Sequence, residues 1–246
     1  NPNYHLYRCD FTDMEALRRV MSAHTIDAII HLGAQAGVRY SIAHPLQTQH
    51  VNITGTTNIF ECARKFNIPQ VIFASSSSVY GNQEKTPFSE DDAVDYPISP
   101  YAASKKACEL IAFTYHHLYN INAIGVRLFN VYGERGRPDM SPFLFADALY
   151  HGKEITRFGD GSMQRDFTYV DDIVDGIVRC VDASLKYEII NLGNAHPVAV
   201  KEFIARMESL TGKSARIVEK PIPPGDVRRT FADTRKAKRL LGWQAT

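Results

Sequence analysis

Residues 27–37 read DAIIHLGAQAG, a short apolar run followed at once by a loop of small residues. A run of this kind is typical of a strand that is buried on both faces of a parallel sheet. The same order recurs along the chain, because QVIFA at 70–74 is followed by SSSSVYG and AIGVRLF at 123–129 is followed by NVYG. Helical patterns lie between these runs. The alternation predicts an α/β fold, a doubly wound parallel sheet with helices on both faces.

The remaining elements are predicted from apolar spacing and from capping residues. Thr12 is suited to cap the first helix, with Glu15 as its partner in a capping box. After Pro138 the pattern loosens into clusters of Pro, Gly and charged residues, which favours a smaller second lobe. We therefore expect a strand over 4–9 and helices over 13–24, 45–66 and 100–117.

Two parts are expected to interleave along the chain. A dinucleotide-binding domain would comprise residues 1–130 and 165–193, and a substrate-binding lobe residues 131–164 and 194–246. Ligands of such sheets bind beyond the carboxyl ends of the strands. The small-residue and polar loops all follow predicted strands, so this end of the sheet is the predicted site.

The composition narrows the class of protein. The chain has 246 residues and a net charge of +1, which gives no overall attraction to nucleic acid or to membranes. Its apolar runs are far shorter than the ~18 residues of a membrane span. No signal peptide is visible, so a cytoplasmic location is expected. The spacing of Cys9, Cys62, Cys108 and Cys180 matches no metal-binding pattern, and we expect reduced, buried thiols and no metal.

The sequence YAASK at 101–105 carries the strongest chemical signal. Tyr101 and Lys105 are four residues apart on a predicted helix and so share one face. A phenol is a poor base at neutral pH, but a nearby ammonium favours the phenolate. Tyr101 is thus a candidate to take a proton from an alcohol as a hydride leaves the carbon. The four serines of SSSSVYG are placed to hydrogen-bond the reacting oxygen.

Several stretches together resemble the extended short-chain dehydrogenase/reductase family. The likeness is greatest to its nucleotide-sugar 4-epimerases, and especially to the UDP-glucuronate 4-epimerases. It implies a Rossmann-like fold with a smaller C-terminal substrate lobe, NAD as cofactor, a UDP-sugar as substrate and a homodimer. The stretches are HLGAQAGVRYS (31–41), SSSSVYG (75–81), YAASK (101–105), RLFNVYGERGRPDM (127–140), RDFTYVDDIVDGI (165–177) and PPGDV (223–227).

The resemblance also implies roles for single residues. The catalytic set would be Ser76, Tyr101 and Lys105. Cofactor-binding positions, beside Tyr101 and Lys105, would be Asp10, Phe11, Leu32, Gly33, Ala34, Gln35 and Asn52. Substrate-binding positions would be Arg39, Ser41, Ser76, Ser77, Asn130, Arg137, Arg165 and Asp226. Arginine suits this task because its planar fork binds phosphate or carboxylate through two hydrogen bonds.

The serine block separates the possible reactions. The 4,6-dehydratases that resemble this chain have Asp-Glu where Ser77 and Ser78 stand, and the related decarboxylases have Glu at the second position. Hydroxyls there favour oxidation and re-reduction at C4 of the sugar, with UDP-glucuronate converted to UDP-galacturonate through a 4-keto intermediate. Asn130 departs from the glucuronate pattern, so UDP-glucose or UDP-N-acetylglucosamine 4-epimerisation stays open as an alternative.

An alternative to an enzymatic function arises from the amino-terminal part of the fold. Dinucleotide binding in this family uses a glycine fingerprint, GxxGxxG, at the first strand-to-helix turn, and the sequence contains none. The resemblance aligns residues 4–9 with the family's third strand, so the first βαβα portion is expected to be missing. The alternative is therefore an inactive, truncated nucleotide-sugar-binding protein, and we expect these 246 residues alone to bind NAD poorly.

Overall fold

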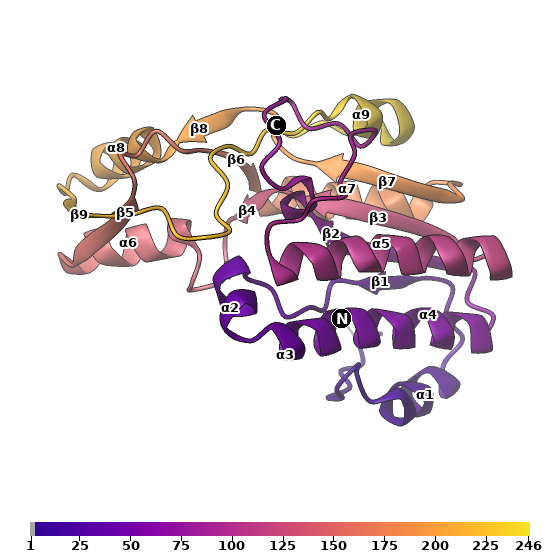
Figure 1. Cartoon of the computed structure of the whole chain (residues 1–246). Helices are drawn as coiled ribbons and strands as arrows, with labels where there is room; N and C mark the ends of the chain where they lie inside the picture. The colour runs from indigo at the N-terminus through magenta and orange to yellow at the C-terminus, as the bar shows by residue number, and fades with distance from the viewer. Residues whose placement is uncertain (1–2) are drawn as a thin grey trace. The chain divides into compact units, whose positions relative to one another are not determined.

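The computed structural model describes residues 3–246 and separates into two compact units (Figure 1). Unit 1 comprises the chain up to Gly81, Val94–Arg127 and Ile177–Ile190. Unit 2 comprises Asn82–Ala93, Leu128–Gly176 and Asn191–Thr246. The units interleave along the sequence, and unit 2 also takes residues 82–93, 128–130, 165–176 and 191–193, which were expected in the other part. The ligand roles of the two parts stay predictions.

A four-stranded sheet organises unit 1. Its strands are β1 (Ile29–His31), β2 (Gln70–Ser76), β3 (Asn122–Leu128) and β7 (Tyr187–Leu192), in the order β1-β2-β3-β7. β1 and β2 are parallel, with Ile29 opposite Val71. The interior of β2 and β3 is buried, as expected of strands that are covered on both faces. The predicted α/β fold is confirmed.

Helices precede and connect these strands in the predicted order. They are α1 (Met14–Ser22), α2 (Val38–Ala43), α3 (Pro45–Gln49), α4 (Gly55–Lys65), the 3₁₀ helix η2 (Ser77–Tyr80) and α5 (Pro100–Tyr119). α4 and α5 run side by side (Figure 1). Phe60 of α4 meets Phe73 of β2 edge to face at 5.8 Å, in a core that also holds Ile68 and Val71. The apolar positions of the sequence thus fill the space between sheet and helices.

The long helix predicted over residues 45–66 contains a local irregularity. Between α3 and α4 lies a π-helical turn, η1 (His50–Thr54), and the backbone stays helical through it. Such wide turns occur often at functional sites because they alter the direction of a side chain. Here the turn carries Asn52, which is buried.

Two local predictions were wrong. Residues 4–9 form no strand and are exposed, since no described strand lies beside them to share backbone hydrogen bonds. The first helix is capped by Asp13 rather than Thr12, because its Oδ1 accepts from the amides of Glu15 and Ala16 at 3.0 and 3.1 Å. Aspartate is a stronger N-cap than threonine, and Asp13 occupies the capping position.

Unit 2 contains two small sheets. One has the order β4 (Asn130–Tyr132), β6 (Gln164–Tyr169), β8 (Pro197–Ala199), and the other pairs β5 (Glu154–Phe158) with β9 (Arg216–Lys220) in parallel. Its further helices are α6 (Ser141–His151), α8 (Val200–Thr211) and α9 (Arg235–Leu241), while α7 (Val170–Asp182) continues into unit 1. The loose sequence pattern therefore folds into short, regular elements.

A buried carboxylate holds unit 2 together where its segments converge. Asp166 of β6 accepts hydrogen bonds from the amides of Asn194, Ala195 and Ala232 at 2.9, 3.1 and 2.8 Å. Burial raises the pKa of Asp166, and these three amides act in the opposite direction. One side chain of the RDF sequence thus joins β6 to two later loops.

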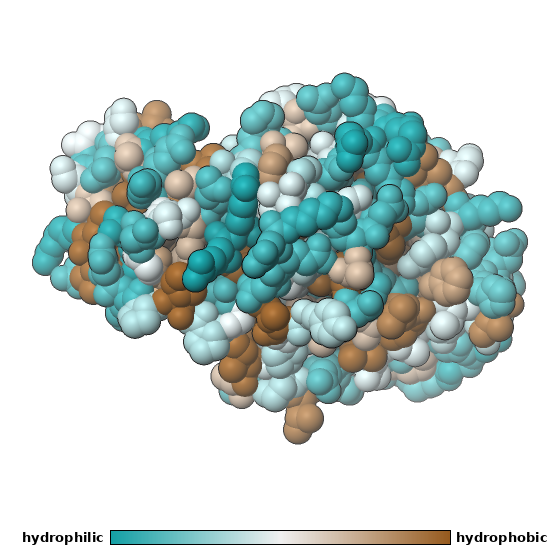
Figure 2. Space-filling view, turned by 45° about the horizontal axis from the view of Figure 1, so that its top comes forward, coloured by the Kyte–Doolittle hydropathy of each residue, from teal (hydrophilic) through white to brown (hydrophobic). Residues whose placement is uncertain are grey.

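The surface and the thiols agree with an ordinary globular chain. Hydrophilic residues predominate on the face shown in Figure 2, and apolar residues form separate small areas there. No helix within the described residues is long and apolar enough to cross a membrane, and no cluster of metal-binding side chains occurs among them. All four cysteines are free; Cys62, Cys108 and Cys180 are buried as predicted, whereas Cys9 is exposed.

Candidate functional site

The YAASK sequence forms the start of α5. Ser99 caps the helix by accepting a hydrogen bond from the Ala102 amide at 3.1 Å, and Pro100 occupies the first turn. This start is well defined because proline fits the first helical turn and serine is a preferred cap. Tyr101 is half-buried, and Lys105 lies one turn further along the same face, where it is 4% exposed.

The end of β2 meets this face of α5. The Lys105 ammonium donates to the carbonyl oxygen of Ala74 at 2.9 Å. Ser76 ends β2 and caps η2 by accepting a hydrogen bond from the Ser78 amide at 3.2 Å. Since α5 contacts both β2 and η2, the structure brings Ser76, Tyr101 and Lys105 to one region of unit 1. Ser77 is half-buried at the start of η2.

The loop after β1 is fixed by Asn52. The Asn52 Oδ1 atom accepts from the Gln35 amide at 2.7 Å, while Asn52 Nδ2 donates to the Gln35 carbonyl at 3.2 Å. The same Nδ2 atom donates to the Ser104 hydroxyl of α5 at 2.8 Å. The π-helical turn therefore links the predicted cofactor loop to the helix that carries Tyr101 and Lys105.

Phe11 and Gly33 lie against each other. A Cβ atom on Gly33 would come within 2.9 Å of the Phe11 ring, and one on Gly55 within 2.2 Å, so the ring fits between two glycines. The ring also meets His31 edge to face at 5.3 Å. Burial, and then the charge of Lys105, lower the pKa of His31 to about 4, so this imidazole is neutral.

The other predicted residues of unit 1 have different surroundings. Asp10 is exposed, and hydrogen bonds from the amide and hydroxyl of Thr12, both at 2.8 Å, lower the pKa of its carboxyl. Ser41 is buried, and its hydroxyl donates to the Val38 carbonyl at 2.6 Å. Leu32 and Arg39 are exposed, and Ala34 is half-buried. Their predicted roles in ligand binding stay predictions.

Four predicted substrate-binding residues belong to unit 2. Arg165 of β6 donates to the carboxylate of Asp226 at 2.7 Å, so these two predicted nucleotide-binding residues form an ion pair. Arg137 forms a forked pair with Asp139, with Nε–Oδ1 at 3.0 Å. Asn130 accepts from the Thr230 hydroxyl at 3.4 Å. The Arg137 side chain is exposed, whereas that of Arg165 is mostly buried, and their predicted roles in substrate binding stay predictions.

Comparison with known proteins gives the family. The family model described as GDP-mannose 4,6 dehydratase, within the extended short-chain dehydrogenases/reductases, matches residues 1–246. The chain belongs to this family. The predicted resemblance is thereby confirmed.

Two relatives of known sequence are similar to nearly the whole chain. An uncharacterised protein of Methanocaldococcus jannaschii is 51% identical over 98% of this chain and 74% of its own length. A UDP-glucuronate 4-epimerase of Thermodesulfobacterium geofontis is 46% identical over 98% of this chain and 75% of its own length.

Solved structures of the family share the fold. The UDP-glucuronic acid 4-epimerase of Bacillus cereus, in complex with UDP-glucuronic acid and NAD, superposes with a TM-score of 0.94 at 33% identity, over 100% of this chain and 78% of that one. The UDP-glucose 4-epimerase of Thermotoga maritima, with UDP-glucose, has a TM-score of 0.94 at 30% identity, over 100% and 81%.

One pair of residues at this site was not predicted from the sequence. Glu109 and Arg127 form a buried ion pair, with Nε–Oε1 at 2.8 Å. Burial alone would raise the pKa of Glu109, but the hydrogen bonds and charge of Arg127 outweigh it and hold the pKa below its usual range. Its signal in the sequence was the spacing Tyr101, Lys105, Glu109, which continues the YAASK face by one turn.

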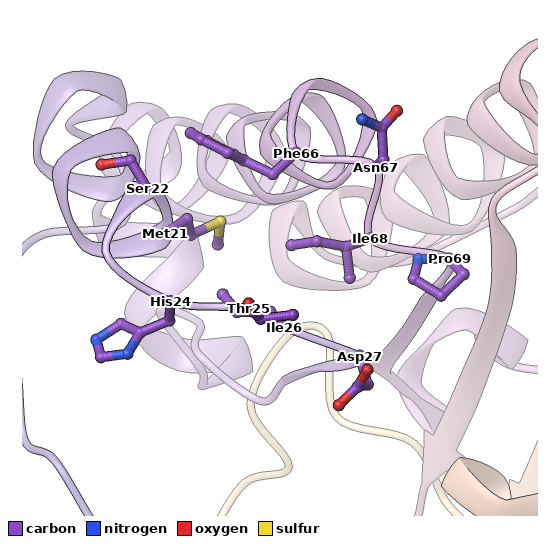
Figure 3. Close-up of a pocket in the computed structure, with 10 residues that line it drawn as sticks. All are labelled: Met21, Ser22, His24, Thr25, Ile26, Asp27, Phe66, Asn67, Ile68 and Pro69. Atoms are coloured by element: carbon purple, nitrogen blue, oxygen red, sulfur yellow. The ribbon is translucent and has the colours of Figure 1, made fainter.

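A pocket of about 410 Å³ lies elsewhere in unit 1. It is lined by the end of α1 and the segment that leads to β1 on one side, and by residues 66–69 between α4 and β2 on the other (Figure 3). Met21 and Ile68 project into it, whereas His24 points away (Figure 3). It adjoins the amino ends of β1 and β2, whereas the family's ligands bind at carboxyl ends, so the pocket is separate from the candidate site.

Proposed function

We propose that the protein is an NAD-dependent UDP-sugar 4-epimerase whose substrate is UDP-glucuronate and whose product is UDP-galacturonate. The observation that carries the proposal is the meeting of α5 with the end of β2, where Tyr101, Lys105 and Ser76 lie in one region. Family relatives named UDP-glucuronate 4-epimerase support it, since one is 46% identical over nearly the whole chain.

The residues of unit 1 fit a dinucleotide cofactor. The Lys105 ammonium has three donors and is 4% exposed, and Ala74 O is the acceptor at 2.9 Å, so donors remain for ribose hydroxyls. Gly33 is exposed, and its small size lets the loop pack closely on Phe11. When bound, NAD would supply a hydride acceptor and donor at C4 of the sugar.

The mechanism that we propose assigns the proton transfers to Tyr101. Its hydroxyl oxygen takes the proton of the C4 hydroxyl as the C4–H bond breaks, and Lys105 stabilises the phenolate. Ser76 donates a hydrogen bond to the C4 oxygen. The resulting 4-keto sugar turns in the pocket, and Tyr101 returns the proton after hydride reaches the opposite face. The oxidation state of substrate and product is the same.

The surroundings of Ser76 favour epimerisation over dehydration, although the family model is described by a dehydratase. A 4,6-dehydratase needs an acid and a base near C5 and C6 of the sugar, and Ser77 and Ser78 provide hydroxyls only. A second candidate substrate is UDP-glucose, which Asn130 favours and which the Thermotoga maritima relative binds.

The test is substrate preference of the purified protein as its gene encodes it. UDP-glucuronate, UDP-glucose and UDP-N-acetylglucosamine are each incubated with the protein and NAD, and the products are separated by chromatography. We expect the highest kcat/KM with UDP-glucuronate. A higher value with a neutral sugar would overturn the substrate assignment, and loss of water from the sugar would overturn epimerisation. Absence of bound NAD would instead favour the inactive binding protein.

We also propose a homodimer in the cytoplasm. Leu110 and Phe113 of α5 are 57% and 49% exposed, and Leu46 of α3, which contacts α5, is 80% exposed. Exposed apolar side chains on adjoining helices favour a helix-to-helix interface. Sedimentation equilibrium of the wild type and of Leu110→Glu tests this: the variant should shift from dimer to monomer.

A further inference from the structure

A buried carboxylate lies one helical turn beyond Lys105. The Glu109 side chain is 2% exposed, and its Oε1 atom accepts from the Ser75 hydroxyl at 2.6 Å and from Arg127 Nε at 2.8 Å. Its Oε2 atom accepts from Arg127 Nη2 at 2.9 Å and faces Lys106 at 3.3 Å. The proposed proton and hydride transfers do not use Glu109. Burying an ion pair costs desolvation free energy that only well-placed hydrogen bonds offset. We therefore expect this pair to have a specific role.

The spacing of α5 places Glu109 in a row with the catalytic residues. Tyr101, Lys105 and Glu109 recur at intervals of four and share one helix face. Lys105 donates to the carbonyl of Ala74, and Glu109 accepts from the hydroxyl of the next residue, Ser75. Two successive turns of α5 are thus tied to two successive residues of β2.

The residue that follows these two is Ser76, the last residue of β2. We propose that Glu109 is a positioning residue, which through Ser75 and Arg127 fixes the end of β2 against α5 and so aligns Ser76 with Tyr101 and Lys105. The kinetic consequence rests on the proposed epimerase function, because Glu109 touches neither the sugar nor the cofactor in that mechanism.

Neighbouring elements hold the ion pair in place. Arg127 of β3 lies over the Tyr80 ring of η2 at 4.8 Å, and the Tyr187 hydroxyl of β7 donates to the Glu109 carbonyl at 3.1 Å. Side chains of β2 and β3 therefore bind the Glu109 carboxylate, while β7 binds its main-chain carbonyl and η2 packs on Arg127. We expect a displacement of Glu109 to move the end of β2 first, because Ser75 there is its hydrogen-bond partner.

The kinetic test compares Glu109→Gln, Ser75→Ala and the double variant. We expect kcat to fall about tenfold or more in each while KM stays within about twofold, because alignment affects the transition state rather than substrate binding. The double variant should lose no more than the worse single variant, since both act through one contact. Glu109→Asp should retain part of kcat.

Ile68→Val is the matched control for stability, because Ile68 is buried in the core of unit 1 and lies just before the start of β2, away from Ser75 and Ser76 at its end. It should lower the melting temperature and leave kcat unchanged. A kcat for Glu109→Gln equal to that of wild type would overturn the proposal, and so would losses that simply multiply in the double variant.

A crystal structure of Glu109→Gln separates this inference from the proposed function. We expect the bond between Lys105 Nζ and Ala74 O to lengthen beyond 3.5 Å, while the fold of unit 1 is kept. An unchanged bond would overturn the positioning role. A wild-type protein that turns over no UDP-sugar would refute the proposed function alone, because the structural readout does not depend on activity.

Discussion

The side chain of Asn52 and the main chain of Gln35 form a reciprocal pair of hydrogen bonds, at 2.7 and 3.2 Å. Asn52 belongs to a π-helical turn and Gln35 to the loop after β1, so two segments that carry predicted cofactor residues are joined by one amide. A carboxamide is suited to this task because it donates and accepts at once.

Replacement of Asn52 by Leu is expected to loosen the loop after β1. The Gln35 amide would lose a partner at a part-buried position, which costs about 1–3 kcal/mol of folding free energy. We expect calorimetry to show weaker NAD binding. The loss of NAD-binding free energy should exceed the loss of unfolding free energy. Thr57→Ala on the same helical segment removes only a bond to the Ile53 carbonyl and serves as the control. Equal NAD affinity in the two variants would show that the Asn52–Gln35 hydrogen bonds do not hold the loop in its NAD-binding conformation.

Replacement of Tyr101 by Phe removes the proposed acid and base and keeps the ring. We expect kcat to fall by roughly 10²–10⁴, the usual contribution of such a group, with KM little changed. The measurement is steady-state turnover of UDP-glucuronate, with circular dichroism to check the fold. Tyr96→Phe, at an exposed tyrosine of the same unit, is the control. Substantial turnover by Tyr101→Phe would exclude this residue as the base.

Local patterns predicted the elements around the candidate site well. The apolar runs before Gly33 and Ser75 became β1 and β2, and YAASK became the first turns of α5. These elements are set by apolar spacing, by proline at the helix start and by serine as its cap, all of which are local. The loop after β1 follows its strand as predicted, whereas the first two serines of SSSSVYG extend β2 and residues 130–132 form the strand β4.

Features that depend on distant partners were not predicted. Arg127 is apolar-flanked in the sequence, and only the fold shows that it pairs with Glu109. Residues 4–9 have the composition of a strand, but a strand needs a neighbour, and the described chain offers none. The π-helical turn at Asn52 has no spacing signal, because it depends on contacts with Gln35 and Ser104.

Replacement of Arg127 by Met should destabilise the protein strongly. It leaves the Glu109 carboxylate buried without its partner, which typically costs about 3–5 kcal/mol. The double variant Arg127→Met, Glu109→Gln should lose less than Arg127→Met alone, since no charge is left unpaired. Urea unfolding at pH 7 measures both. A double variant as unstable as the single one would show that packing, rather than the charge, determines the cost.

The burial of His31 predicts a dependence of stability on pH. Its pKa is about 4 in the folded protein, through burial first and the charge of Lys105 second, against 6.5 for an unperturbed histidine. Because the folded pKa is the lower one, the unfolded state binds the proton first as the pH falls. The stabilisation is complete above pH 6.5 and is lost progressively down to about pH 4.

The difference in pKa corresponds to roughly 3 kcal/mol at most. Urea unfolding between pH 7 and pH 4.5 should therefore show a steeper loss of unfolding free energy in wild type than in His31→Gln. The matched control is His117→Gln, at an exposed histidine of α5, which should keep the slope of wild type. A slope for His31→Gln equal to that of wild type would show that other groups determine acid stability, since the amide cannot take up the proton.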